Sequence, residues 1–506
     1  MIFKQILNSL LIFVIVNQTF SQNIYPKREL RGVWIATVAN IDWPASCSDS
    51  TQKQMADLIS MFDKLKAAGI NTVFFQVRTE CDAFYNSPYE PWSYWLTGEQ
   101  GKAPNPFYDP LAFAIAEAHK RGMELHAWFN PYRAYHKQTD YELASNQITK
   151  THPAWILKFK DLSILNPGIP AVNHYIAKII ADVVRRYDVD GIHFDDYFYP
   201  YSPKIKNEDA KTFLKYQGRF TNIADWRRNN INQMVAEVYD SIKSINPRVK
   251  FGISPFGIVE NKFAYTKGME SYNILYADPV TWLKDKTVDY ILPQLYWAIG
   301  NKAADYASLL PWWALSAGKR QVYVGLFSTK IAAPDYKGSP TELESEINLS
   351  RQMIRTFGTC FYSAKSIALN YSHFADSLKV YYKHPSLIPA MPWIDSVSPL
   401  TPANLSATED SSSIILTWNP PPPAKDLDTA YKYVIYRFDY PEQVNIDDAW
   451  HIMNIQNGGI RIFSDTTVDR IRRQYTYAVT ALDRLNNESP PKIFTILLNK
   501  IEVPSR

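Results

Sequence analysis

The sequence predicts a (β/α)8 TIM barrel of the α/β class, followed by an all-β immunoglobulin-like sandwich. Short apolar strands alternate with amphipathic helical patterns through about 350 residues, which is typical of a parallel (β/α) barrel. Towards the C-terminus the helical patterns stop, and short alternating strands follow one another at close spacing. A doubly wound open sheet is the main alternative to the barrel, but no GxGxxG motif follows any of the expected strands.

Eight strands are expected in the barrel part, each followed by a helical pattern. The clearest helices are TQKQMADLISMFDKLKAAG, which ends at Gly69, and DPLAFAIAEAHKRG, which begins at Asp109 and ends at Gly122. Long polar and aromatic connections follow the third and fourth strands, as is typical of ligand-binding loops over a barrel mouth. The expected strands are LRGVWIATV from Leu30, NTVFFQV from Asn71, ELHAWFN from Glu124, VDGIHFDD from Val189, VKFGISPF from Val249, VDYILPQLY from Val288, QVYVGLF from Gln321 and GTCFYSA from Gly358.

The first residues have the pattern of a cleaved secretory signal, which we place at residues 1–21. Lys4 precedes an apolar run, and Thr19 and Ser21 supply small residues where signal peptidase cleaves. The run is too short to span a bilayer, so we expect an exported protein with no transmembrane anchor after cleavage, in the periplasm, the cell envelope or outside the cell.

The rest of the chain is expected to form a barrel over residues 28–383, a proline-rich linker over 384–399 and a sandwich over 400–500. The linker prediction rests on the stretch HPSLIPAMPWIDSVSP, which is rich in proline and has no helical or strand periodicity.

Composition narrows the classes of partner. Hydrophobic residues at 46% supply ample core, and a net charge of +4 is too weakly basic to indicate nucleic acid. Aromatic residues at 14% suit sugar-stacking platforms, although an aromatic-rich core would explain them as well. Cys47, Cys81 and Cys360 are too few and too scattered for a disulfide framework or a metal site, and we expect three isolated buried thiols, with one disulfide as the alternative. We predict no metal and no cofactor.

The stretch Asp190–Tyr197 is the strongest candidate for a functional site. Strand alternation places His193 and Asp195 on one face and apolar residues on the other, as at a barrel mouth, where one face meets helices and the other a ligand. Asp196 is expected to point away from the barrel axis unless the strand bulges. The alternative is that the two carboxylates only cap the following segment.

The same alternation predicts inward polar side chains at the carboxyl ends of three further strands, where barrel active sites lie. Burying such groups is costly unless they pair or meet a ligand, although a purely structural network would give the same pattern. The candidates for substrate binding are Arg78, His126, Trp128, Asn130, Arg133, His193, Gln294, Tyr296 and Trp297. Arg78 either binds an acidic sugar, like Arg133, or forms a salt bridge with Glu80.

Carboxylates beside amides and aromatic rings suit glycoside cleavage of a polysaccharide substrate. One carboxyl protonates the leaving oxygen, while the other attacks the anomeric carbon or activates water. Asp195 is the first catalytic candidate, Glu80 is the expected second carboxylate, and Asp196 orients Asp195, acts directly or only caps. Asp82 and Glu260 are weaker candidates. A metal held by the two inward histidines and Asp195 is the rival mechanism, although no HxH or HExxH spacing supports it.

Six dispersed motifs resemble the glycosyl hydrolase-like 10 family over about residues 29–382: LRGVWIATVANIDWP, NTVFFQVR, PYR after HAWFN, DGIHFDDYFYP, GISPFG and ILPQLYW. The resemblance implies a (β/α)8 barrel in an exported, often envelope-associated bacterial protein. It also implies a glycosidase acting on bacterial glycan, with peptidoglycan strands stripped of their peptides as the substrate class. Many family members carry a lipoprotein cysteine after the signal, and this chain does not. The rival class is a non-catalytic cell-envelope glycan-binding protein, or a metal-dependent barrel hydrolase or deacetylase.

Two further resemblances concern shorter stretches. DGIHFD is similar to the fourth-strand motif of the α-amylase superfamily, which implies Asp195 as the nucleophile, with His193 in place of the usual arginine. The amylase acid, a glutamate at the end of the fifth strand, has no counterpart in GISPF, so the acid stays unassigned. Near the C-terminus, ILTW, YKYVIY and YTYAVTA resemble a fibronectin type III domain, in which we find no catalytic constellation.

Overall fold

A computed structural model describes residues 25–137, 140–333, 341–469, 471 and 474–498 of the chain. The expected signal segment lies outside the described residues. Among the described helices, none combines the length and the apolar character that crossing a bilayer requires.

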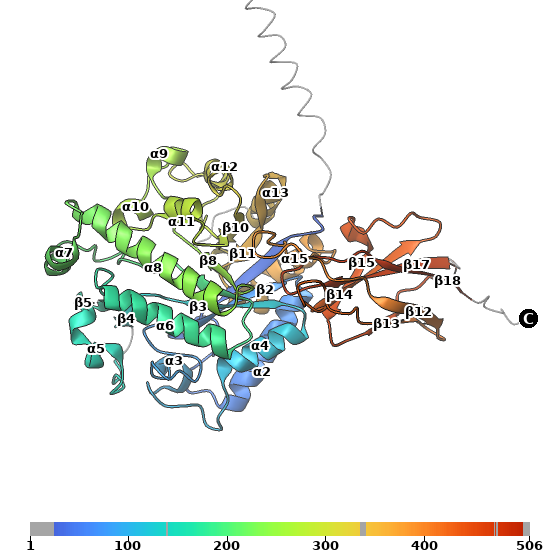
Figure 1. Cartoon of the computed structure of the whole chain (residues 1–506), viewed down its shortest axis with the longest axis horizontal. Coiled ribbons are helices and arrows are strands. Elements are labelled where there is room, and N and C mark those ends of the chain that lie inside the picture. The colour runs from blue at the N-terminus through green and yellow to red at the C-terminus, as the bar shows by residue number, and fades with distance from the viewer. Residues whose placement is uncertain (1–24, 138–139, 334–340, 470, 472–473, 499–506) are drawn as a thin grey trace, which may run out of the picture.

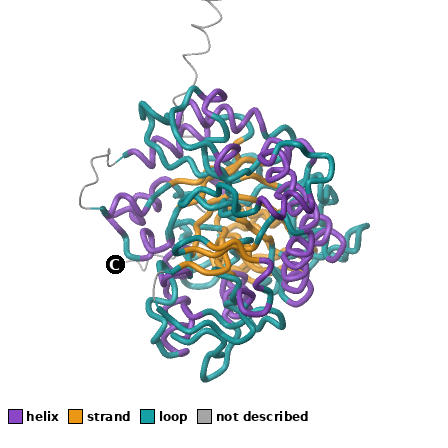
Figure 2. Tube along the Cα trace, turned by 90° about the vertical axis from the view of Figure 1, so that its left-hand side faces the viewer, coloured by secondary structure: helices purple, strands orange, loops and turns teal. Residues whose placement is uncertain are grey.

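Eight parallel strands close into a barrel in the order β1-β11-β10-β9-β8-β7-β3-β2, as the sequence predicts (Figure 1). All eight expected strands are present, although β9 has only two residues in regular pairing. Figure 2 shows the strands gathered at the centre with helices around them. The barrel strands are β1 (Leu30–Ile35), β2 (Thr72–Arg78), β3 (Glu124–Phe129), β7 (Gly191–Phe194), β8 (Lys250–Ile253), β9 (Tyr290–Ile291), β10 (Gln321–Leu326) and β11 (Thr356–Phe361).

The helices around the barrel begin and end where the local sequence chemistry requires. Ser50 caps the first helix by accepting from the backbone N–H of Lys53, and Asp109 caps another by accepting from Ala112. Gly69 and Gly122 have positive φ just past the ends of these helices, where a residue with a β-carbon would be strained. The main helices are α2 (Thr51–Ala67), α4 (Pro110–Lys120), α6 (Pro170–Arg186), α8 (Ile223–Ile245), α11 (Pro279–Asp285), α12 (Tyr306–Ser316), α13 (Glu342–Gln352), α14 (Ala364–Ala368) and α15 (Phe374–Tyr381).

The two long connections that the sequence predicts as mouth loops contain secondary structure of their own. A small antiparallel sheet of order β4-β6-β5 follows β3, and it places Arg133 at the barrel mouth. Its strands are β4 (Arg133–His136), β5 (Ile156–Lys158) and β6 (Leu162–Leu165), with the short helix α5 (Ile148–Thr151) in the same connection. The connection after β7 contains α7 (Ala210–Tyr216). Other short helices are α3 (Tyr94–Thr97) after β2, and α9 (Asn261–Ala264) and α10 (Ser271–Ile274) after β8.

The C-terminal part forms two antiparallel sheets, of order β12-β13-β16 and β15-β14-β17-β18, which pack around a separate apolar core. They lie beside the barrel in Figure 1. The strands are β12 (Ala403–Glu409), β13 (Ile414–Asn419), β14 (Lys432–Asp439), β15 (Ile452–Asn457), β16 (Ile462–Asp465), β17 (Gln474–Leu482) and β18 (Lys492–Leu497).

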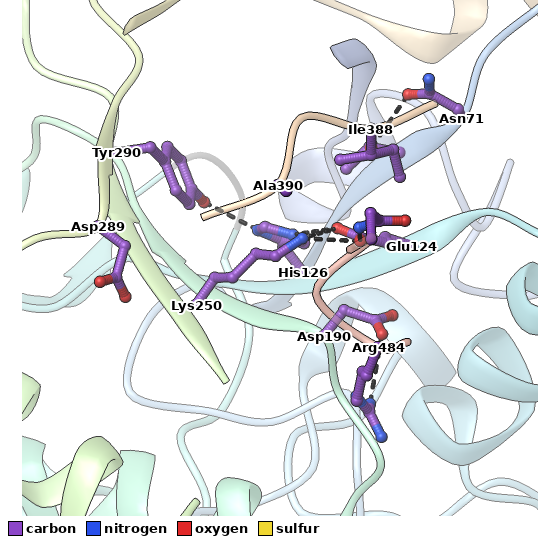
Figure 3. Close-up of polar contacts among 12 residues, drawn as sticks. Asn71, Glu124, His126, Asp190, Lys250, Asp289, Tyr290, Ile388, Ala390 and Arg484 are labelled. Atoms are coloured by element: carbon purple, nitrogen blue, oxygen red, sulfur yellow. Dashed lines mark hydrogen bonds and ion pairs between the residues drawn. The ribbon is translucent and has the colours of Figure 1, made fainter. Parts of the chain in front are cut away.

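These sheets are docked on the amino-terminal end of the barrel through polar contacts (Figure 3). The Arg484 guanidinium, from the loop after β17, contacts the carboxylates of Asp188 and Asp190, which directly precede β7. Asn486 donates to Glu124 Oε1 at 2.8 Å, and Lys250 Nζ lies 2.7 Å from both oxygens of the same carboxylate. The barrel base is therefore completed by side chains from the C-terminal sheets.

Candidate active site

A cavity of about 410 Å³ opens at the carboxyl ends of the barrel strands, the end where barrel active sites lie. It falls in the size range of small-molecule sites and has an aromatic wall with a few polar groups. Its lining includes Trp34, Gln76, Trp128, Asn130, Arg133, Asp195, Asp196, Tyr197, Tyr199, Tyr201, Ser254, Gln294, Tyr296, Phe327 and Tyr362.

Asp195 is a buried carboxylate held by fixed donors at this cavity. The indole N–H of Trp128 donates to Oδ2 at 2.9 Å, and the backbone N–H of Tyr197 donates to Oδ1 at 3.2 Å. The Asn130 amide nitrogen donates to Asp195 Oδ2 at 2.6 Å, and the Asn130 amide oxygen accepts from Arg133 Nη1 at 3.2 Å. These donors hold the Asp195 side chain in one orientation against the cavity.

Asp196 also lines the cavity, so the expectation that it points away from the barrel axis is wrong. Regular strand β7 ends at Phe194, and strand alternation therefore no longer governs the two residues that follow it. The hydroxyl of Tyr201 donates to Asp196 Oδ2. The chain turn after β7 thus brings two neighbouring carboxyl groups to one cavity.

The surroundings of these two carboxyl groups push their pKa values apart. Burial raises the pKa of Asp195 to about 6, against the opposing effect of the nearby Arg133 cation and the Trp128 hydrogen bond. Burial, with the neighbouring Asp195 charge as the next cause, raises the pKa of Asp196 further, to about 8. At neutral pH the site therefore holds one ionised and one protonated carboxyl, which is the arrangement that acid/base chemistry requires.

Arg78 and Glu80, expected inside, lie away from the cavity wall because strand β2 bulges. The register between β2 and β3 shifts after Gln76, and this moves later residues off the inward alternation. Arg78 forms a buried salt bridge with Glu90, at 2.6 and 2.7 Å, instead of one with Glu80. Glu80 is buried beside Tyr141, whose hydroxyl donates to it at 3.0 Å. Burial and the adjacent Asp82 charge raise the pKa of Glu80 to about 8.

His126 and His193 face the barrel interior as alternation predicts, but they lie below the cavity. Trp34 Nε1 donates to His193 Nε2 at 3.1 Å, so Nε2 carries no proton. The proton of the neutral ring therefore lies on Nδ1, which donates to the Tyr290 hydroxyl at 3.1 Å. That hydroxyl also lies 2.9 Å from His126 Nδ1. Gly191 makes room for the His126 ring, because a β-carbon at position 191 would lie 2.5 Å from that ring.

The rival metal site fails on this geometry. Tryptophan and tyrosine occupy both ring nitrogens of His193, and Tyr290 and Glu124 occupy those of His126. Among the described residues, the one grouping with metal-ligand spacing is Asp395, Asp426 and Asp428, which lies far along the chain from the barrel mouth.

The remaining candidates divide between the cavity wall and its surroundings. Trp297 packs against Phe256, with ring centroids 5.4 Å apart, outside the cavity wall. Asp82 accepts from Thr79, and Glu260 pairs with Lys262, so neither reaches the cavity. The candidates at the wall are Trp128, Asn130, Arg133, Gln294 and Tyr296, with Asp195 and Asp196.

Apart from Trp128 and Tyr296, the aromatic residues of the wall were not predicted as individual site residues. The Trp34 ring, from β1, lines the cavity, and so does Tyr362, which follows β11. Tyr197, Tyr199 and Tyr201 come from the segment after β7, where an aromatic run in the sequence was the available signal. Arg133 lies over the Tyr197 ring at 4.0 Å, which fixes a cation beside the carboxyl pair.

The family model described as "Glycosyl hydrolase-like 10" matches residues 29–341. The chain is 40% identical over 493 residues to glycosyl hydrolase YngK of Bacillus subtilis (strain 168), covering 94% of each protein. It is also 40% identical over 363 residues to glycosyl hydrolase DigH of Escherichia coli (strain K12), covering 66% of this chain and 82% of that protein.

Among solved structures, the PgaB (BpsB) glycoside hydrolase domain from Bordetella bronchiseptica is similar with a TM-score of 0.45 and 13% identity. That match covers 72% of this chain and 100% of the other. The catalytic domain of the β-amylase from Paenibacillus polymyxa gives a TM-score of 0.43 and 9% identity, over 69% of this chain and 98% of that one.

Proposed function

The chain belongs to the glycosyl hydrolase-like 10 family, and from this we propose that it is an exported glycoside hydrolase that cleaves O-glycosidic bonds of a bacterial cell-wall glycan. The substrate we propose is peptidoglycan strands that lack stem peptides. The observation that carries the hydrolase proposal is the pair Asp195 and Asp196 in one aromatic-walled cavity, with pKa values near 6 and 8. Export rests on the residue pattern of segment 1–21, and the substrate rests on the family resemblance.

The difference between the pKa values of Asp195 and Asp196 suggests a different role for each carboxyl group. Asp196, protonated at neutral pH, donates its proton to the leaving glycosidic oxygen as the bond to the anomeric carbon breaks. Asp195, ionised, attacks the anomeric carbon or takes a proton from the attacking water. Trp128, Asn130 and the Tyr197 N–H hold the Asp195 carboxylate for either step, and Arg133 supplies a positive charge nearby.

The C-terminal sheets fit our proposal of a fibronectin type III domain. The hydroxyl of Tyr475, near the start of β17, donates to the carbonyl of Asp469 at 2.8 Å and accepts from its N–H at 2.9 Å. A tyrosine at the start of this strand that bonds to the backbone a few residues upstream is a hallmark of such sandwiches.

The experiment that tests the function is release of reducing ends from peptide-stripped peptidoglycan, with α- and β-glucans as comparison substrates. We expect activity on the stripped glycan strands and little on either glucan. Activity on a glucan alone would reject the proposed substrate and keep the hydrolase. Binding to stripped glycan without release of reducing ends would instead identify a glycan-binding protein.

The pH dependence of kcat/KM is expected to be bell-shaped, with limbs near pH 6 and pH 8. The acid limb reports ionisation of Asp195, because activity needs its carboxylate. The alkaline limb reports loss of the Asp196 proton, because activity needs its acid form. Asp196→Asn is expected to lower the rate about 10²-fold or more and to remove the alkaline limb. An alkaline limb that survives this substitution would contradict the assignment of Asp196 as the acid.

A further inference from the structure

A second cavity, of about 220 Å³, lies where the barrel, the segment after α15 and the C-terminal sheets meet. It lies at the amino-terminal end of the barrel, near the start of β1, whereas the carboxyl pair lies at the opposite end. Its lining includes five cationic side chains and no Asp or Glu. The cations are Arg31, Lys66, Lys379, Lys383 and Lys432.

Three of these cations have no counter-charge in contact. No carboxylate of the described chain lies within 4 Å of the ammonium groups of Lys66, Lys383 or Lys432, whereas Lys379 pairs with Asp376 at 3.0 Å. Lys432 is buried, and burial lowers its pKa. Burial and the nearby Lys432 charge lower the pKa of Lys66 to about 8. Cations gathered in this way without an anion are electrostatically costly.

The carboxylates nearest to Lys432 are already engaged by other cations. Lys250 lies 2.7 Å from Glu124 (Figure 3). The same carboxylate accepts from Asn486 at 2.8 Å. Asp190 lies 2.8 Å from the His119 ring and 3.3 Å from the Arg484 guanidinium. Glu124 and Asp190 lie close enough to favour the charged form of Lys432 but make no ion pair with it, and no acid among the described residues has this effect on Lys66.

Arg31 provides an independent indication of a missing partner. Its side chain is 1% exposed, its Nε donates to Glu29 at 2.8 Å, and its Nη1 donates to the carbonyl of His384 at 2.8 Å. Its Nη2 has no hydrogen-bond partner among the described residues, although it is buried. A buried donor on an unpaired guanidinium nitrogen at a cavity wall is expected to meet an acceptor.

We propose that this cavity binds a dianionic phosphoryl group, through Arg31 and the ammonium groups of Lys66 and Lys432, with Lys383 at its edge. The cations that lack a paired acid favour a dianion over a monocarboxylate, and Arg31 offers its one unbonded guanidinium nitrogen, Nη2, to a phosphate oxygen. The group comes either as free inorganic phosphate or as a phosphomonoester on a larger molecule. Bound there, it joins the barrel to the C-terminal sheets.

The test is calorimetric titration of the full chain with inorganic phosphate at constant ionic strength. Saturable one-to-one binding is expected. Lys66→Met keeps the apolar stem and is expected to weaken binding about tenfold or more, because it removes a charged contact. Lys64→Met is the matched control, because Lys64 is exposed in the same last turn of α2 and does not line the cavity. It is expected to bind phosphate like the parent protein.

Three results would overturn the proposal: no saturable binding by the parent protein at millimolar phosphate, equal weakening by both lysine variants, or glucuronate binding as tightly as phosphate. The first needs no variant, so it holds even if Lys66→Met folds poorly. A hexose 6-phosphate that binds more tightly than inorganic phosphate supports the proposal with a phosphomonoester as the source. Equal or weaker binding of the hexose phosphate supports it with free phosphate as the source.

Discussion

Asp195→Asn is expected to lower kcat about 10³-fold or more on the glycan substrate, with the protein still folded. The substitution keeps the shape of the side chain and removes the charge that attacks carbon or activates water. Trp128 Nε1 would then face an amide in place of a carboxylate at 2.9 Å. The measurement is release of reducing ends by the purified variant. Asp161→Asn, at an exposed aspartate ahead of β6, is the matched control and is expected to keep full activity.

Stability distinguishes a catalytic loss from a folding defect. Because the pKa of Asp195 is raised from 3.8 to about 6 in the folded state, folded protein holds this proton more tightly than the unfolded chain. The Asp195 carboxyl therefore contributes stability that is present below about pH 4 and is lost as the pH rises to about 6, and the asparagine variant does not share this loss. The variant is expected to unfold at the same temperature as the parent near pH 4 and at a higher one above pH 6. Undiminished turnover by a folded variant would rule out Asp195 as the catalytic carboxylate.

Glu90→Gln is expected to have the largest effect on stability, costing about 3–5 kcal/mol of unfolding free energy. The Arg78 guanidinium is buried and makes two bonds to the Glu90 carboxylate, so removing the carboxylate leaves a buried cation without its counter-charge. Arg78 also donates to the carbonyls of Asn130 and Pro131, at 2.6 and 3.0 Å. Activity is therefore expected to fall as well, because Asn130 contacts Asp195. Denaturant unfolding measures the first effect.

Two controls accompany this variant. Glu99→Gln breaks an exposed pair with Lys102 and is expected to leave the unfolding midpoint unchanged. The double variant Arg78→Met/Glu90→Leu removes both buried charges and is expected to recover most of the lost stability. If Glu90→Gln proves as stable as the parent protein, the Arg78–Glu90 pair does not stabilise the loop after β3.

The barrel could be predicted because its signals are local. Apolar strands, helix caps and the glycines past the helix ends each act over a few residues, and all eight strands form where expected. Alternation also found the cavity face of Trp128, Asn130 and Asp195. Alternation predicts the side of the strand on which a residue lies, but it does not predict how deep in the barrel the residue lies. His126 and His193 are accordingly on the predicted face but beneath the cavity.

The errors in the site come from places where alternation stops. The bulge after Gln76 removes Arg78 and Glu80 from the cavity, and nothing in the local sequence marks it. The end of β7 at Phe194 turns Asp196 into the cavity and so supplies the second carboxyl that alternation could not find. The partner of Arg78 could not be predicted either, because Glu90 lies beyond an irregular turn whose course depends on the folded barrel.

The polar docking of the C-terminal sheets constrains how such a protein can change in evolution. Asn486 and Arg484 add contacts to Glu124 and Asp190, two buried carboxylates at the base of the barrel that also bind Lys250 and His119. Asp190 directly precedes the strand whose far end leads into Asp195 and Asp196. Removing the C-terminal strands would expose both acids to solvent and take away the Asn486 and Arg484 contacts, while Lys250 and His119 would stay as their partners. In proteins that keep both parts, the residues at positions 124, 190, 484 and 486 are therefore expected to change as a set.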